Sequence, residues 1–299
     1  MLIYKHKIKK KGFLDSAINY IVIRRLSRLS KRHVANGVRQ LVVFSFDHIA
    51  HRINVDGAFE KDELYAFFEW MNSLGVDFGT ANAMDIGANI GNHSIYFSDY
   101  FSRVDSYEPN PPVYEVLCLN AKLVDNVHCH NYGLSDRSRT GRIKLKKTNI
   151  GASSVTFTED DGGEEIELRS IDSLTNLSNV KLVKIDVEGH ELHVLNGAKR
   201  FLRENSPIIL FEHHYADFLD KKSKVVDFLK ENGYENFATV RKHPYAYKVL
   251  KKASGKNLMR SILPQSVKIN LTKYPEPGTY VFIVAIPSWL DERINLCNS

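Results

Sequence analysis

Acidic and small residues that could hold a nucleotide-like cofactor lie at the ends of two predicted strands. Asp85 and Ile86 end the first and lead into a turn that contains Gly87 and Gly91, and Glu108 comes at the end of the second. A glycine at such a turn lets the backbone approach a ligand closely, and the helix N-terminus beyond it presents unpaired N–H groups. A carboxylate at the end of the next strand can accept hydrogen bonds from two ribose hydroxyls.

The glycine spacing favours S-adenosylmethionine over a nicotinamide cofactor. A dinucleotide site uses G-x-G-x-x-G to seat a pyrophosphate at a helix N-terminus, whereas this turn has Gly87 and Gly91 with Asn89 between them. S-adenosylmethionine carries no phosphate, and its sulfonium and amino-acid end call for acidic and polar groups. Asp85, Asn89 and Asn92 can supply these groups. An NAD-dependent oxidoreductase remains the alternative to a protein that binds S-adenosylmethionine.

Acids and bases that could act on an acceptor come later in the chain, also at predicted strand ends. Ligands of open α/β sheets bind at the carboxyl ends of the strands, and a hydroxyl acceptor must lose its proton to a base. Asp186 is the leading candidate. The full set is Asp186, Glu188, His190, Glu212 and His213. Glu188 could instead offset the dipole of the following helix. Asp186, Glu212 and His213 are weak candidates for a divalent metal site, but metal dependence is not expected.

The elements that must position these residues alternate between strand and helix patterns over residues 82–233, which predicts a Rossmann-like α/β fold. We expect a mostly parallel seven-stranded sheet with helices on both faces and a β-hairpin insertion over about 141–170. The predicted strands are 83–86, 103–107, 127–132, 180–185, 207–211, 237–240 and 279–286, and helices are predicted at 113–123 and 221–232.

The flanking segments are basic, and the chain has a net charge of +6. The sequence predicts a basic helical extension over residues 1–55, followed by one methyltransferase-like domain over 56–299. This domain is expected to contain a basic loop over about 241–273. The extension would either cover the core or make a peripheral contact with anionic lipid or an acidic partner. Sequence-specific nucleic-acid recognition is not expected. Three cysteines without ligand spacing fit a reducing, cytoplasmic compartment; they are Cys118, Cys129 and Cys297.

Four segments in order resemble the FkbM-type methyltransferases, over about residues 56–212. They are Asp85-Ile86-Gly87-Ala88-Asn89-Ile90-Gly91-Asn92-His93-Ser94, Tyr107-Glu108-Pro109-Asn110, Gly133-Leu134-Ser135-Asp136 and Lys184-Ile185-Asp186-Val187-Glu188-Gly189-His190-Glu191. Gly57-Ala58-Phe59-Glu60 also fits. The resemblance implies O-methylation of a small-molecule or glycan hydroxyl, with S-adenosyl-L-methionine as cofactor and S-adenosyl-L-homocysteine as product.

The resemblance also implies roles for particular residues. Asp85, Gly87 and Asn89 would line the methionine end of the cofactor, Glu108 the ribose, and Ser135 with Asp136 the adenine. The complete cofactor prediction is Asp85, Gly87, Ala88, Asn89, Gly91, Asn92, Ser94, Glu108, Pro109, Asn110, Ser135 and Asp136. The catalytic prediction is Asp186, Glu188 and His213. A cofactor-binding module without turnover and an RNA methyltransferase are the remaining alternatives.

Overall fold

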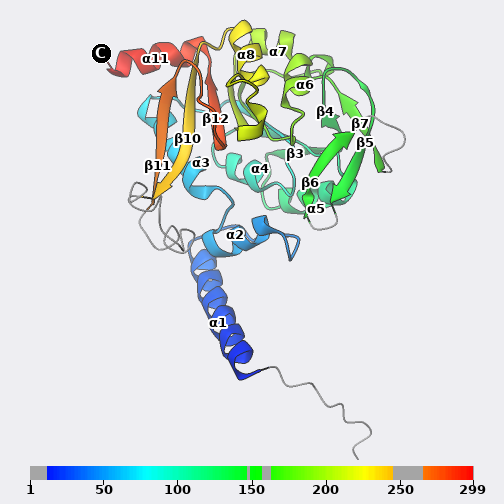
Figure 1. Cartoon of the computed structure of the whole chain (residues 1–299), viewed down its shortest axis with the longest axis vertical. Helices are drawn as coiled ribbons and strands as arrows, with labels where there is room; N and C mark the ends of the chain where they lie inside the picture. Colours follow the sequence, from blue (N-terminus) through cyan, green and yellow to red (C-terminus); the bar gives the residue numbers. More distant parts are fainter. Residues whose placement is uncertain (1–11, 147–148, 157–162, 245–264, 299) are drawn as a thin grey trace, which may run out of the picture.

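Eight strands form the central sheet, in the order β11-β10-β12-β9-β8-β1-β2-β3 (Figure 1). The computed structural model describes residues 12–146, 149–156, 163–244 and 265–298. The five strands from β9 to β3 run parallel, whereas β12 pairs antiparallel with both β9 and β10, and β11 pairs antiparallel with β10. The bounds are β1 (Asn82–Ile86), β2 (Arg103–Tyr107), β3 (Val127–His130), β8 (Val180–Ile185), β9 (Ile208–His213), β10 (Asn236–Pro244), β11 (Gln265–Thr272) and β12 (Tyr280–Ile286). The Rossmann-like prediction is confirmed, with one strand more than expected.

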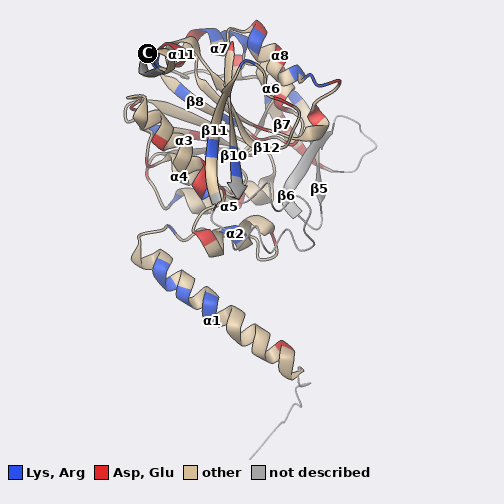
Figure 2. Cartoon of the chain, turned by 60° about the vertical axis from the view of Figure 1, so that its left-hand side comes forward, with Lys and Arg blue, Asp and Glu red and all other residues tan. Residues whose placement is uncertain are grey.

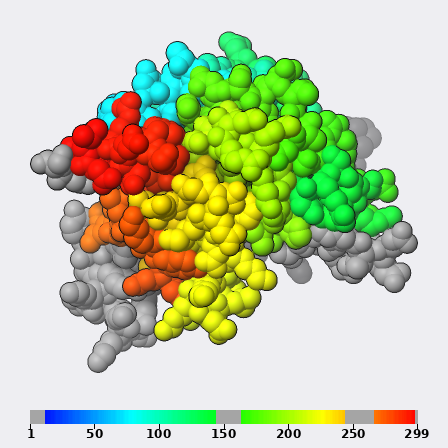
Figure 3. All heavy atoms as spheres, turned by 90° about the horizontal axis from the view of Figure 1, so that it is seen from above, coloured from blue at the N-terminus to red at the C-terminus, as the bar shows by residue number. Residues whose placement is uncertain are grey.

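Helices cover both faces of this sheet, because successive strand residues point to opposite sides. Met84 and Ile86 of β1 pack in one apolar layer with α6, α7 and α8, whereas Ala83 packs in the other layer with α3, α4 and α11. Seen from the end opposite α1, α11 lies at one edge of the molecule, with α6 to α8 beside it (Figure 3). The bounds are α3 (Lys61–Ser73), α4 (Asn92–Phe97), α5 (Pro111–Ala121), α6 (Glu191–Asn196), α7 (Lys199–Asn205), α8 (Lys224–Glu231) and α11 (Ser288–Asn298).

The predicted hairpin insertion is part of a second, four-stranded sheet in the order β4-β7-β5-β6. Gly141 pairs with Ile166, so the predicted pairing of the two outer segments is confirmed. The strand between them, β6, was not predicted, because its sequence is polar and contains glycine. Three buried side chains, Ile143, Ile166 and Leu168, form a small core for this sheet. The bounds are β4 (Gly133–Leu134), β5 (Arg139–Lys146), β6 (Asn149–Thr156) and β7 (Glu164–Arg169).

The prediction of a basic loop over 241–273 is wrong at both ends. β10 extends to Pro244, and β11 pairs with it along its length, from Phe237 opposite Thr272 to Pro244 opposite Gln265. Val267 and Ile269 of β11 pack against the apolar layer below α3, which explains why this segment is a strand. Residues 245–264, where the rest of the loop was predicted, lie outside the described residues.

The N-terminal extension divides into a projecting helix and a packed segment. α1 (Phe13–Ala35) has no buried residue and extends away from the domain (Figure 1). The prediction that it covers the core is wrong, because α1 buries none of its apolar side chains against the domain. In contrast, the following segment and α2 (His48–Asp56) pack on Ile90 of the glycine turn and on α5 through Leu41, Phe44 and Ile53. None of the described helices combines the length and apolar character needed to cross a bilayer.

Candidate active site

The turn after β1 is held tightly between the ends of β2 and β8. The backbone nitrogens of Gly87 and Ala88 both donate to the carbonyl oxygen of Tyr107, at 3.0 Å each. Gly87 has a φ of +76°, and a Cβ atom at this position would lie 1.9 Å from the carbonyl oxygen of Asp186. Only glycine therefore fits here, because it has no side chain to keep the ends of β1 and β8 apart.

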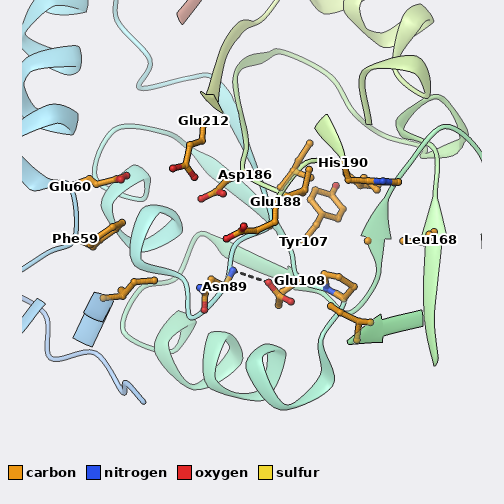
Figure 4. A pocket seen from close by; sticks show the side chains of 18 of the residues that line it. Phe59, Glu60, Asn89, Tyr107, Glu108, Leu168, Asp186, Glu188, His190 and Glu212 are labelled. Atoms are coloured by element: carbon orange, nitrogen blue, oxygen red, sulfur yellow. Dashed lines mark hydrogen bonds between the residues drawn. The ribbon is translucent and has the colours of Figure 1, made fainter. Parts of the chain in front are cut away.

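Glu108 lies at the end of β2 with its carboxylate directed at this turn (Figure 4). Its Oε2 accepts a hydrogen bond from the backbone nitrogen of Asn89, and its Oε1 accepts one from that of Asn110, both at 2.9 Å. Burial raises the pKa of Glu108 to about 7 despite these two hydrogen bonds. Each oxygen keeps a second lone pair, so the ionised carboxylate can still accept hydrogen bonds from a ligand.

A buried lysine connects the acidic residues of β1 and β8. Lys184 Nζ lies 3.5 Å from Asp85 Oδ1 and 3.1 Å from Asp186 Oδ2. Burial opposes the lysine charge, but the two carboxylates prevail and raise its pKa. Asp85 is fully buried, and its Oδ2 accepts a hydrogen bond from Ser94 Oγ at 2.6 Å. Asp85 and Lys184 therefore hold Asp186 in place from below.

Three carboxylates meet above the turn, as Figure 4 shows for Glu60, Asp186 and Glu212. Burial and the neighbouring charge of Asp186 raise the pKa of Glu212 to about 8. Burial works against ionisation of Asp186 too, but Lys184 and His93 outweigh it and lower the pKa of Asp186. Glu60 Oε2 lies 3.0 Å from His93 Nε2. At neutral pH the pair of Asp186 and Glu212 thus carries one proton and one negative charge.

These groups line one cavity of about 350 Å³ at the carboxyl ends of the parallel strands, within the usual range for ligand pockets. Besides His190, seven residues predicted or weighed for cofactor binding or catalysis contribute to its wall, namely Gly87, Asn89, Glu108, Pro109, Asp186, Glu188 and Glu212. His190, which was also weighed, lines the cavity, and burial lowers its pKa to about 4. Glu191, rather than Glu188, accepts the backbone hydrogen bonds of the turn before α6. Glu188 is therefore not needed for capping.

Several predicted cofactor residues support the cavity without lining it. Asn92 exchanges two hydrogen bonds with the backbone of Phe59, and Ser94 holds Asp85. Ser135 bonds His190 and Asp136 instead of facing the cavity. Ala88, Gly91 and Asn110 also lie outside the wall and act through their backbone. Asp136 pairs with Arg139, and neither Ser135 nor Asp136 lines the cavity, so their contact with the adenine stays a prediction.

The structure places His213, a predicted catalytic residue, outside the cavity wall. β9 continues two residues beyond the predicted end, so Glu212 and His213 point to opposite faces of the strand. His213 packs edge-on against Phe218, and its Nδ1 lies 3.5 Å from Asp217. In the described part of the chain, no group of three or more His, Cys, Asp or Glu side chains is arranged to hold a metal ion. Asp186, Glu212 and His213 do not converge.

Sequence reasoning missed two parts of the wall. Apolar residues of the smaller sheet, Leu134, Ile143 and Leu168, line one end, next to Tyr107. Residues that precede β1 line the other end, and they are His48, Ile49, Phe59 and Glu60. The match of Gly57-Ala58-Phe59-Glu60 to the FkbM pattern was the available signal for the second part.

Sequence comparison with known proteins identifies the family of this chain. The methyltransferase FkbM domain model matches residues 85–235. Hexuronic acid methyltransferase AglP of Haloferax volcanii is 31% identical over 168 residues, which is 53% of this chain and 69% of that protein. Precorrin-6y C5,15-methyltransferase of Geobacter metallireducens has a TM-score of 0.40 and 18% identity, over 73% of this chain and 84% of that one. Methyltransferase FkbM of Methylobacillus flagellatus has a TM-score of 0.36 and 17% identity, over 64% of this chain and 48% of that one. The chain belongs to the FkbM methyltransferase domain family and is an S-adenosylmethionine-dependent methyltransferase.

Proposed function

We propose that this methyltransferase methylates a hydroxyl oxygen of a sugar or glycan, and that a uronic acid is the first acceptor to test. The observation that carries the proposal is the convergence of Glu60, Asp186 and Glu212 beside the glycine turn. Carboxylates accept hydrogen bonds from sugar hydroxyls, and one of them can take the proton that the acceptor must lose. The similarity to a relative named for hexuronic acid supports the same class of acceptor.

The cavity residues suit the methyl donor in charge and in shape. Glu108 would accept hydrogen bonds from the ribose hydroxyls, and Tyr107, Leu134 and Leu168 would enclose the adenine. S-adenosylmethionine supplies a methyl group that its sulfonium already activates, so the main task of the protein is to position the two reactants. The acidic wall near Asp186 offsets the positive charge of the sulfonium.

The pair of Asp186 and Glu212 can accept the proton that the acceptor hydroxyl loses. A bond forms between the acceptor oxygen and the methyl carbon while the carbon–sulfur bond breaks, and its electron pair stays on sulfur. Lys184 keeps Asp186 ionised, so Asp186 would accept the hydrogen bond of the acceptor hydroxyl and orient it. With both carboxylates ionised, the proton passes to the pair, where Glu212 is the stronger base because of its raised pKa.

The test is a transfer assay with methyl-labelled S-adenosylmethionine and three acceptors: a methyl glucuronide, a methyl glucoside and glucosamine. We expect label on a sugar oxygen, located by NMR, with the highest kcat/KM for the glucuronide. Asp186→Asn should abolish most of the transfer, whereas Glu231→Gln, an exposed carboxylate outside the cavity, should leave it unchanged. Label on the glucosamine nitrogen alone, or no transfer to any of the sugars, would contradict the proposal.

A further inference from the structure

We propose that α1 binds the surface of an anionic lipid membrane. Its first half, residues 13–23, exposes large apolar side chains to an extent that is unusual for a folded protein. Phe13 is 86% exposed and Ile21 is 65% exposed. The full set of exposed large apolar residues in this half is Phe13, Leu14, Ile18, Tyr20, Ile21, Val22 and Ile23. No described part of the domain covers them, since α1 buries none of its residues.

The charges of α1 are separated along its axis. All five of its basic residues lie in the second half and are Arg24, Arg25, Arg28, Lys31 and Arg32, whereas Asp15 is the one charged residue of the first half. Figure 2 shows these basic residues on the half nearest the domain, with the far half almost free of charge. Five lysines, Lys5, Lys7, Lys9, Lys10 and Lys11, also precede this apolar half in the sequence. Basic residues therefore flank the apolar residues on both sides, which suits a helix that lies along the headgroups with its apolar side chains in the lipid.

The dimensions fit an interfacial position. Eleven helical residues span about 16 Å at 1.5 Å per residue, roughly half of a 30 Å hydrocarbon core, so the apolar half is too short to cross a bilayer and suits binding along its surface. The basic half would then lie beside the lipid phosphates, where arginine can form bidentate hydrogen bonds.

The attachment of α1 leaves this surface accessible. α1 meets the domain at its last turns, where His33 Nε2 lies 3.1 Å from the carbonyl oxygen of Val55 in α2. The apolar half therefore projects away from the domain (Figure 1).

Charge complementarity favours a membrane over a second copy of the chain. Two copies that pack along α1 would bring ten basic residues into one small interface, and α1 offers a single acid, Asp15, to offset them. An anionic bilayer satisfies both halves of the helix at once, because it supplies apolar volume and negative phosphates.

The test is co-sedimentation of the full chain with vesicles of phosphatidylcholine alone or with one quarter phosphatidylglycerol. We expect binding to the anionic vesicles that weakens as salt is added. Each basic residue near such a surface strengthens binding roughly fivefold, so replacing Arg24, Arg25 and Arg28 with Gln should lower partitioning about 100-fold. The matched control removes the same charge at and just before the start of α8, with Gln at the exposed Lys221, Lys222 and Lys224.

A second pair of variants tests the apolar half. Ile18→Gln with Ile21→Gln should lower partitioning by about tenfold or more, since each loses buried apolar area in lipid. The control, Leu219→Gln with Leu271→Gln, changes two equally exposed residues elsewhere and should bind like the parent chain. S-adenosylmethionine affinity and circular dichroism should stay unchanged in all four variants, because none of the substituted residues lines the cavity.

Three results would overturn the proposal. They are equal binding to neutral and anionic vesicles, no binding to either, and a concentration-dependent dimer in sedimentation velocity that Ile18→Gln with Ile21→Gln dissociates. The last result would assign the apolar half of α1 to a contact between copies.

Discussion

Replacing Glu108 with Gln isolates the carboxylate that we place under the cofactor ribose. In the protein, each carboxylate oxygen accepts one backbone N–H, from Asn89 and from Asn110, at 2.9 Å. A Gln amide can accept one of these but presents its own N–H₂ group to the other. The variant should lose one charged hydrogen bond to a ribose hydroxyl, about 1.5–3 kcal/mol, or roughly 10- to 150-fold in Kd for S-adenosylmethionine at pH 8.

The difference in cofactor affinity between the parent protein and Glu108→Gln should depend on pH, because the Glu108 carboxylate titrates. The pKa of Glu108 is raised to about 7, so its charged form predominates at pH 8 and its neutral form at pH 6. If the ribose binds the charged form, affinity falls as pH falls through 7, by about tenfold between pH 8 and pH 6. Gln resembles the neutral acid at every pH. The ratio of the two Kd values should therefore shrink by about tenfold from pH 8 to pH 6.

Isothermal titration calorimetry at pH 6, 7 and 8 measures this ratio, with Glu231→Gln as the matched surface control. The other acids of the cavity titrate in both proteins, so their contribution cancels in the ratio. Equal Kd values at pH 8 would refute the ribose assignment. A large ratio that stays constant with pH would show instead that the variant loses cofactor affinity because the introduced Gln side chain disturbs the glycine turn.

The remaining predictions concern the acid pair and the glycine turn. Asp186→Asn should lower kcat by about 100-fold or more in initial-rate assays, with Kd for the cofactor little changed, since its role is to orient the acceptor hydroxyl for proton loss to the acid pair; a full rate would mean that another group orients the acceptor. The pKa of Glu212, raised to about 8, predicts that kcat rises as pH increases through 8 and that Glu212→Gln removes this rise; a rise retained in the variant would assign it to another group. Gly87→Ala should lower the free energy of unfolding in urea by about 2–5 kcal/mol, because the backbone has a positive φ and the new Cβ would meet the Asp186 carbonyl. Gly189→Ala shares the positive φ but has open space around it, so it should lose only about 1–2 kcal/mol; equal losses in the two variants would mean that the close approach at Gly87 is unimportant.

Strand patterns and strand-end acids could be predicted from the sequence because both are local. β2 and β8 have the predicted bounds, since each is a short strand pattern that ends in charged or turn-forming residues. The prolines after Asn110 begin α5, as expected for residues that lack an N–H at a helix start. Glu108 and Asp186 both line the cavity for the same reason, that parallel strands end on one side of the sheet.

The missed features depend on contacts between distant segments. Glu60 reaches the cavity because it precedes α3 and contacts His93, a long-range pairing that no local pattern specifies. His213 was misplaced because a two-residue extension of β9 decides which neighbour faces the cavity. α1 was misplaced because an exposed apolar helix has the same composition as a core helix, and only the packing distinguishes them.

A crystal structure of the protein with S-adenosylhomocysteine tests the central claim most directly. We predict the ribose hydroxyls on Glu108, the adenine between Tyr107 and Leu168, and the sulfur facing Asp186 and Glu212. Product bound outside this cavity, or bound within it with the sulfur turned away from the two acids, would contradict the account.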